Sequence, residues 1–400
     1  MSRIRIIRNI KLLPVFNFFR CFVLFNLIQV LYIHEVAGSY VFAMGMMTLM
    51  SLFNALLDIP TGILSDKIGR KMTLILSSVS YMFTTVLYVM ASFCYPHLCF
   101  ILGSFFYGLA LSLYSGTLTA IAYETMSQLK IKRKYPDFIG KCSSTTQLGH
   151  ATAALLAGYL SYKIGYMYTV ALTLIPQIIS LLISLFIVEA EYGNYIKEHK
   201  IDIRNVLRKF RENKKLMLIC ITKSITVGSK NSSHRFEPVY FKLLISIQFI
   251  GFLRFLKQSC GFFSYLFSGR IINKLGEGRT LFLSVWSIEM LKIAGLIMNN
   301  FVTPFLYSIT NLFHGSMLTS FVSLEQNEFT DEERATMGSI ISLFSNLFTA
   351  LFTLLAGYIA DIYGLRAAII AVLVPALIVL PMYNLFVNVR GKFALWFVKK

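Results

Sequence analysis

The residues of this chain that could do chemistry gather in a stretch that otherwise has the composition of a membrane span. The stretch KSITVGSKNSSHRFEPVYF, residues 223–241, places Lys223, Lys230, His234 and Glu237 at positions i, i+7, i+11 and i+14. On a helix these spacings bring the four side chains to one face. Ionisable side chains are costly in hydrocarbon and usually face a cavity or a partner. The pattern therefore predicts a helix that lines a water-filled cavity.

Other ionisable residues fall near the middle of apolar runs, and they are basic. The substrate-binding candidates are Lys230, His234, Arg235, Arg254, Lys257 and His150, and His314 lies at a similar depth. The acids lie toward the ends of the runs: Glu35 and Glu237 outward, and Asp58, Glu124 and Glu325 inward. The predicted middle of the membrane is thus basic and carries no acid.

Unpaired cations in a shared cavity repel one another and lose hydration, and a bound anion would relieve both costs. Because arginine and lysine suit carboxylate and phosphate groups, the pattern predicts an anionic or strongly polar cargo. The alternative is internal pairing, with Arg235 or Lys230 against Glu237 or Glu35, and with the Lys257 ammonium extended to the membrane surface. Both interpretations remain open at this point.

Coupling of transport to protons requires a group that gains and loses a proton between states. The carboxylate candidates are Glu35, Glu124 and Glu237, and the imidazoles of His150 and His234 are further candidates. None of the five has a spacing that distinguishes it from the others.

The composition shows what kind of elements must position these residues. The chain has 400 residues, of which 56% are hydrophobic and only 14% charged, whereas soluble domains are about 25% charged. The net charge of +19 would suggest a nucleic-acid partner in a soluble protein. In a chain this apolar it instead indicates basic loops that flank membrane spans, so no nucleic-acid partner is expected.

Twelve apolar runs are long enough to span a bilayer. Their centres lie near residues 25, 48, 81, 108, 153, 174, 228, 261, 286, 314, 348 and 377. Of the 38 lysines and arginines, 28 fall on one side of these runs and three on the other, which predicts that both termini are cytoplasmic. The first run follows a basic N-terminus and is interpreted as a retained membrane helix.

An internal repeat divides the chain in two. LAGYLSYKIG (156–165) and LAGYIADIYG (355–364) share the pattern LAGY-x5-G, and TGILSDKIG (61–69) aligns with SGRIINKLG (268–276). The predicted domains are a six-helix bundle at 1–188, a cytoplasmic loop at 189–215 and a second six-helix bundle at 216–400. The loop is predicted either as an amphipathic surface helix or as a solvated linker.

A motif between the second and third spans has a recognisable form. The pattern G-x-L-a-D-r-x-G-R-[KR] of the major facilitator superfamily (MFS) is matched by Gly62, Leu64, Asp66, Lys67, Gly69, Arg70 and Lys71, with Ser65 and Lys67 as the main departures. With twelve spans and two parallel halves, the chain resembles an MFS transporter. The resemblance implies an all-α integral membrane fold with twelve transmembrane helices in two pseudo-symmetric six-helix bundles.

The resemblance also implies roles for the gating motif, which consists of Asp58, Gly62, Asp66, Gly69, Arg70 and Lys71. Asp66 would latch the cytoplasmic side by binding a basic residue and a helix N-terminus of the other half, and Arg70 would be its charge partner. Gly62 and Gly69 are expected to permit close helix approach and a tight turn. In the second half Asn273 and Glu277 replace the acid and the base, so that latch is expected to be weaker.

The predicted function is secondary active transport by alternating access, coupled to protons, of a small anionic or polar organic solute such as a metabolite or a carboxylate-type siderophore. The alternative is proton-driven efflux of lipophilic cationic drugs, with Glu35 or Glu237 as the membrane acid. The chain lacks the span-4 basic motif of many superfamily members and the span-5 Gly-Pro pattern of many drug/proton antiporters, which disfavours that alternative. No nucleotide-binding or hydrolase motif is present, so no enzyme activity, metal or other cofactor is expected.

The predicted setting is a bacterial cytoplasmic (inner) membrane, with a monomer in the lipid bilayer that binds a small-molecule substrate and protons.

Overall fold

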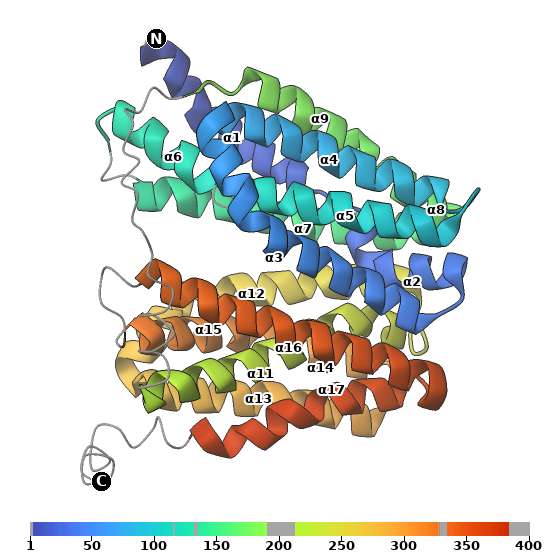
Figure 1. The fold of residues 1–400 in the computed structure, drawn as a ribbon. Helices are drawn as coiled ribbons and strands as arrows, with labels where there is room; N and C mark the ends of the chain where they lie inside the picture. Colours follow the sequence, from blue (N-terminus) through green and yellow to red (C-terminus); the bar gives the residue numbers. More distant parts are fainter. Residues whose placement is uncertain are drawn as a thin grey trace. The chain divides into compact units, whose positions relative to one another are not determined.

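The computed structural model describes residues 3–114, 117–131, 135–189, 213–326, 328 and 334–383, and within these ranges every regular element is a helix. The chain divides into two compact units (Figure 1). One holds Met1–Glu198 and Ile247–Phe252, and the other holds His199–Ser246 and Leu253–Lys400, in each case as far as those residues are described. Most of the predicted linker at 189–215 lies outside the described residues.

Most of the described helices are joined to the next by only a few residues. Those before the central segment are α1 (Arg3–Cys21), α2 (Phe25–Ala37), α3 (Tyr40–Ile68), α4 (Arg70–Met90), α5 (Pro96–Tyr114), α6 (Thr117–Gln128), α7 (Tyr135–Ile164), α8 (Tyr166–Leu172) and α9 (Leu174–Phe186). Those after it are α11 (Lys214–Phe241), α12 (Ile247–Leu275), α13 (Glu277–Met298), α14 (Thr303–Ile309), α15 (Asn311–Gln326), α16 (Arg334–Tyr363) and α17 (Leu365–Val379), which runs into the short 3₁₀ helix η2 (Leu380–Tyr383).

Each of the twelve predicted span centres falls in a different helix. Eight helical stretches of the described chain are long and apolar enough to cross a membrane. The helices α7, α11, α12 and α15 do not meet that standard, although they lie at predicted spans. Three of these four carry the charged residues of the predicted binding site, so their polarity follows from what they must present to their neighbours.

In the first unit, α3 and α4 both pack on α5, and α1 packs on α7. A buried apolar cluster joins α1, α4, α6 and α7 through Phe16, Leu74, Ile121 and Phe138. Arg20 is buried beside this cluster, between the rings of Tyr81 and Tyr114 at 4.6 and 4.7 Å from their centroids. Its guanidinium also donates to the carbonyl of Ala110 at 3.0 Å.

In the second unit, α11, α16 and α17 lie side by side, and α13 packs on α15 (Figure 1). Its buried cluster joins α11, α13 and α15 to η2 through Ile219, Val285, Phe321 and Tyr383. The helix α11 is therefore held on both flanks, which fixes the rotation of its polar face.

Four glycines at helix junctions share one backbone conformation. Gly69, Gly165, Gly276 and Gly364 have φ of 91°, 85°, 84° and 85° and ψ of 155°, 172°, 157° and 167°. This region is essentially restricted to glycine, because a Cβ would clash with the backbone. The four junctions are the glycines that end the repeated sequence patterns, so the repeat in sequence is also a repeat in structure.

At the first of these junctions, a carboxylate caps the start of α4. The backbone N–H groups of Arg70 and Lys71 donate to the two oxygens of Glu189, at 2.6 and 2.7 Å. A carboxylate there satisfies two free donors of the helix N-terminus and lies at the positive end of its dipole. Glu189 follows α9, so this contact ties the end of the first unit to its gating motif.

The junctions differ in what surrounds them, which gives a matched pair of substitutions. A Cβ added at Gly364 would meet no atom of the described residues within 4 Å, whereas at Gly69 it would lie 3.1 Å from a Glu189 oxygen. We expect Gly364→Ala to cost about 1–3 kcal/mol through backbone strain alone. Gly69→Ala should cost more, since it also displaces the cap. Thermal unfolding of both variants in detergent measures the difference, and equal losses would contradict the capping role of Glu189.

Candidate functional site

Eight ionisable side chains of the second unit form one group, which we call the basic cluster. Its members are Lys230, His234 and Glu237 on α11, Arg254 and Lys257 on α12, Glu289 and Lys292 on α13, and His314 on α15. Five of these eight were among the predicted binding or mid-membrane residues of basic type. Figure 1 shows the four helices that carry them.

An ion pair between α11 and α12 anchors the cluster. Lys257 Nζ lies 2.5 Å from Glu237 Oε2, and the two residues are only 4% and 3% exposed. Lys257 therefore pairs internally and does not extend to the membrane surface. Glu237 thus has a cationic partner, which is Lys257, one of the predicted substrate contacts.

Arg254 lies one helical turn away from Lys257 and contacts His234. Its Nη1 approaches both ring nitrogens, with 2.7 Å to Nδ1, and its Nη2 donates to the His234 carbonyl at 3.2 Å. His234 Nδ1 is also 3.5 Å from Glu237 Oε2. Lys257 Nζ lies 3.2 Å from the same Nδ1. Since a guanidinium can only donate, Nε2 is the atom that accepts from Arg254 in the tautomer that directs Nδ1–H to Glu237.

Lys230 bonds to His314 across α11 and α15, through Nζ and Nε2. A charged ammonium only donates, so Nε2 is the acceptor and the neutral ring carries its hydrogen on Nδ1. That Nδ1 is buried, and it has no hydrogen-bond partner among the described residues. His314 therefore presents an unused donor next to a cation.

Glu289 and Lys292 correct the expectation that the middle of the membrane carries no acid. Both are 2% exposed, and their charged atoms are 3.8 Å apart on one face of α13. At that distance they form an ion pair without a hydrogen bond, and Glu289 Oε2 and Lys292 Nζ have no hydrogen-bond partner in the described structure. The sequence EMLK, an acid and a base at i and i+3 inside an apolar run, is the signal that would have identified them.

Donors outnumber acceptors in the basic cluster. Lys230, Arg254, Lys257 and Lys292 bring four positive charges against the two carboxylates, and the lysines repel one another electrostatically. Each ammonium has three N–H donors and a guanidinium has five. Among the described residues, these cations donate hydrogen bonds to one oxygen of Glu237, two imidazoles and one carbonyl. A ligand rich in acceptor oxygens would bind the donors that are left over.

The other predicted residues lie elsewhere. Lys223 pairs with Glu325 of α15 at 2.7 Å, so the four charged positions of the α11 stripe all contact α12 or α15. Arg235 is half-buried on α11. His150 is half-buried on α7 of the first unit, and Glu35 is exposed near the end of α2. The roles predicted for these three residues remain predictions.

In the gating motif, Arg70 contacts two side chains of the described residues. Its Nε lies 3.4 Å from Glu124 Oε1, and its Nη1 donates to Ser65 Oγ at 2.9 Å. Glu124 is thus a charge partner within the first unit. The side chain of Asp66 is outside the part of the chain that the structure describes, so its latch remains a prediction.

The remaining motif positions are simpler. Asp58 is exposed on α3, and Lys71 contributes its backbone N–H to the Glu189 cap. Gly69 makes the expected tight turn. The close helix approach expected at Gly62 is not found among the described residues, because a Cβ there would meet none of their atoms within 4 Å.

Several solved structures share the fold. A mutant form of the nucleoside transporter NupG superposes with a TM-score of 0.79 at 12% identity, covering 94% of this chain and 99% of that one. A bacterial homologue of the human lysosomal transporter Spinster gives 0.70 at 15% identity, with 96% and 97% covered. A variant of the E. coli fucose:proton symporter FucP gives 0.60 at 15% identity, with 95% and 98% covered. No curated protein matches the chain by sequence.

The family is also evident from the sequence itself. The family model described as "Major Facilitator Superfamily" matches residues 12–229, which is more than half of the chain. That span contains the gating motif and the whole of helices α2 to α9. With its apolar helices, this chain belongs to the Major Facilitator Superfamily and is a multi-pass membrane transporter, not an enzyme.

Proposed function

We propose that the protein moves a small anionic or strongly polar organic solute across the membrane by alternating access, and that the basic cluster is where the solute binds. The observation that carries the proposal is the excess of hydrogen-bond donors over acceptors within the basic cluster. Secondary transport of small solutes itself follows from the family and fold. Lipophilic cations fit this cluster poorly, since its carboxylates already pair with lysines.

Two kinds of cation serve different purposes in this proposal. Lys257 is paired with a carboxylate and holds α11 against α12. Lys230 and Arg254 are half-buried and bond only to imidazole and carbonyl groups in the described structure. Neither bonds to a carboxylate among the described residues, and we propose them, with the Nδ1–H of His314, as the contacts of a carboxylate or phosphate.

Proton coupling is proposed to run through Glu237. Of the three carboxylates predicted for that role, Glu237 is the one that belongs to the basic cluster, where it contacts both Lys257 and His234. Protonation of Glu237 would release Lys257, so the proton and the anionic solute would act on the same set of charges. The proposed setting is a bacterial cytoplasmic membrane with both termini in the cytoplasm.

The structural pair can be separated from the binding residues by stability. We expect Lys257→Met to destabilise the protein by about 3–5 kcal/mol, because it leaves Glu237 buried without its cation. The double variant Glu237→Gln/Lys257→Met should recover most of that loss. Lys215→Met is the control, since Lys215 also lies 2.5 Å from a carboxylate, that of Glu328, but is 39% exposed; it should cost about 0–1 kcal/mol. Equal losses for the two single variants would contradict the anchoring role.

Binding can be tested by the thermal stability of the purified protein against carboxylates, organic phosphates and lipophilic cations. A ligand at 100 times its Kd adds about 2.7 kcal/mol. Arg254→Gln and Lys230→Gln should each weaken anion binding roughly tenfold or more, since each removes a charge-assisted contact. Arg270→Gln, at an exposed arginine of the same helix as Arg254, should leave it unchanged. Stabilisation of the wild type by lipophilic cations alone would favour drug efflux.

Coupling requires a transport assay in vesicles with an imposed proton gradient. In the double variant Glu237→Gln/Lys257→Met, which removes a positive and a negative charge together, we expect exchange of labelled solute across the membrane to continue. Accumulation driven by the proton gradient should be lost, because the proposed proton carrier is gone. Unchanged accumulation would exclude Glu237 as the coupling group and leave Glu289 as the next candidate in the cluster.

A further inference from the structure

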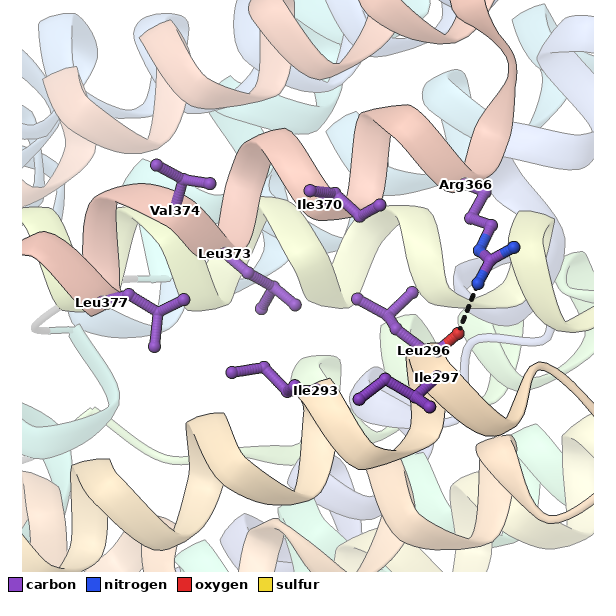
Figure 2. A pocket seen from close by; sticks show the side chains of 8 residues that line it. All are labelled: Ile293, Leu296, Ile297, Arg366, Ile370, Leu373, Val374 and Leu377. Carbon is purple, nitrogen blue, oxygen red and sulfur yellow. Dashed lines mark hydrogen bonds between the residues drawn. The ribbon is translucent and has the colours of Figure 1, made fainter.

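A groove on the second unit runs between α13 and α17 (Figure 2), and none of its lining residues belongs to the basic cluster. Its cavity volume is about 230 Å³, and apart from Arg366 every lining side chain is aliphatic. Leu296 and Leu373 are buried and form its floor, whereas Ile297, Ile370 and Val374 remain exposed. The groove thus opens outward from the helix pair.

One end of the groove is positively charged. Arg366 lies in the first turn of α17, and its Nη2 donates to the carbonyl of Leu296 on α13 at 2.9 Å (Figure 2). This bond fixes the guanidinium at the mouth of the groove while the residue remains exposed. The start of α17 at Gly364 has no side-chain cap, so the positive end of the helix dipole adds to the charge of Arg366.

The length of the groove fits half of a bilayer. Arg366 and Leu377 are eleven residues apart on α17, a rise of about 16 Å at 1.5 Å per residue. The hydrocarbon core of a bilayer is about 30 Å thick, so one leaflet contributes about 15 Å. A single acyl chain with its headgroup at Arg366 would therefore reach the far end of the groove.

The first unit provides an internal comparison. A second pocket follows the other LAGY-x5-G repeat and is lined by Ile164, Tyr168, Ala171, Leu172 and Ile175. Of these, Ala171 and Ile175 align with Ile370 and Val374 of the groove. When the repeat glycines Gly165 and Gly364 are aligned, the position of Arg366 is occupied by Met167. Both units thus offer an apolar pocket at this helix, and an arginine joins the pocket lining in the second unit.

We propose that the groove between α13 and α17 binds one acyl chain of an anionic phospholipid, whose phosphate is held by Arg366. Arginine suits phosphate because its planar guanidinium donates two parallel hydrogen bonds. The aliphatic walls supply the apolar surface for the chain. On the predicted topology, the lipid would belong to the leaflet opposite the cytoplasm.

The test is native mass spectrometry of the purified protein in an uncharged detergent, titrated with phosphatidylglycerol and with phosphatidylcholine of the same chains. We expect the tightest lipid-binding event to favour phosphatidylglycerol. Arg366→Gln, whose amide can still donate to Leu296, should weaken that event at least tenfold, while Arg366→Lys should retain the preference. Lys163→Gln, which removes a predicted outer-loop cation from the first unit, is the control and should match the wild type.

A second variant tests the acyl chain separately from the headgroup. Val374→Trp fills the exposed side of the groove without touching the arginine, and it should weaken the same event by a similar factor. The proposal is overturned if phosphatidylcholine binds as tightly as phosphatidylglycerol, or if either Arg366→Gln or Val374→Trp binds phosphatidylglycerol like the wild type. Displacement of the lipid by an equal concentration of inorganic phosphate would also overturn it, since the site would then be a phosphate site.

Discussion

A charge in hydrocarbon must find a partner, and this constraint shapes the interior of both units. An isolated ion that is buried loses several kcal/mol of hydration, which only a close counter-group can replace. The first unit stabilises Arg20 with two tyrosine faces and a carbonyl. The second unit uses carboxylates and imidazoles. Because its basic cluster has four cations and only two carboxylates, a net positive charge remains there. The two units share a fold and differ in the chemistry of their interiors.

That difference also explains which helices are insufficiently apolar to be recognised as spans by composition. In the second unit these are α11, α12 and α15, which contribute most of the basic cluster. A membrane helix with a charged face is stable only where neighbours cover that face. Their polarity and their packing therefore depend on each other, and the glycine junctions that repeat through the chain help to hold each helix in register.

The sequence predicted the fold well because its evidence was redundant. Run length, the asymmetry of basic residues, the repeat and the gating motif all pointed to the same architecture. It also predicted that Lys230, His234, Arg254 and Lys257 would share a region, since all four fall near the middle of predicted spans. The ion-pair and hydrogen-bond partners of these residues could not be predicted, because pairing depends on the rotation of neighbouring helices. Glu289 and Lys292 were missed for a related reason: each neutralises the other within a run whose mean hydropathy stays high.

The cap at Glu189 shows the same limit on a smaller scale. A glutamate that follows α9 has no local feature that connects it to the start of α4, which is more than one hundred residues away. Likewise, the close approach expected at Gly62 is not met by any described neighbour, because a glycine in a motif shows only that a side chain is absent. It does not show which neighbour, if any, uses the space.

The geometry of the two buried ion pairs has a mechanical consequence. Glu289 and Lys292 are on one helix, so no movement between helices changes their separation. Glu237 and Lys257 are on different helices, and sliding or rotation of α11 against α12 would pull them apart. The first pair therefore moves with α13 as a unit. The second is an interhelical ion pair, and its separation changes whenever α11 and α12 move relative to each other. Any motion that opens it must deliver a new partner to each charge at the same moment.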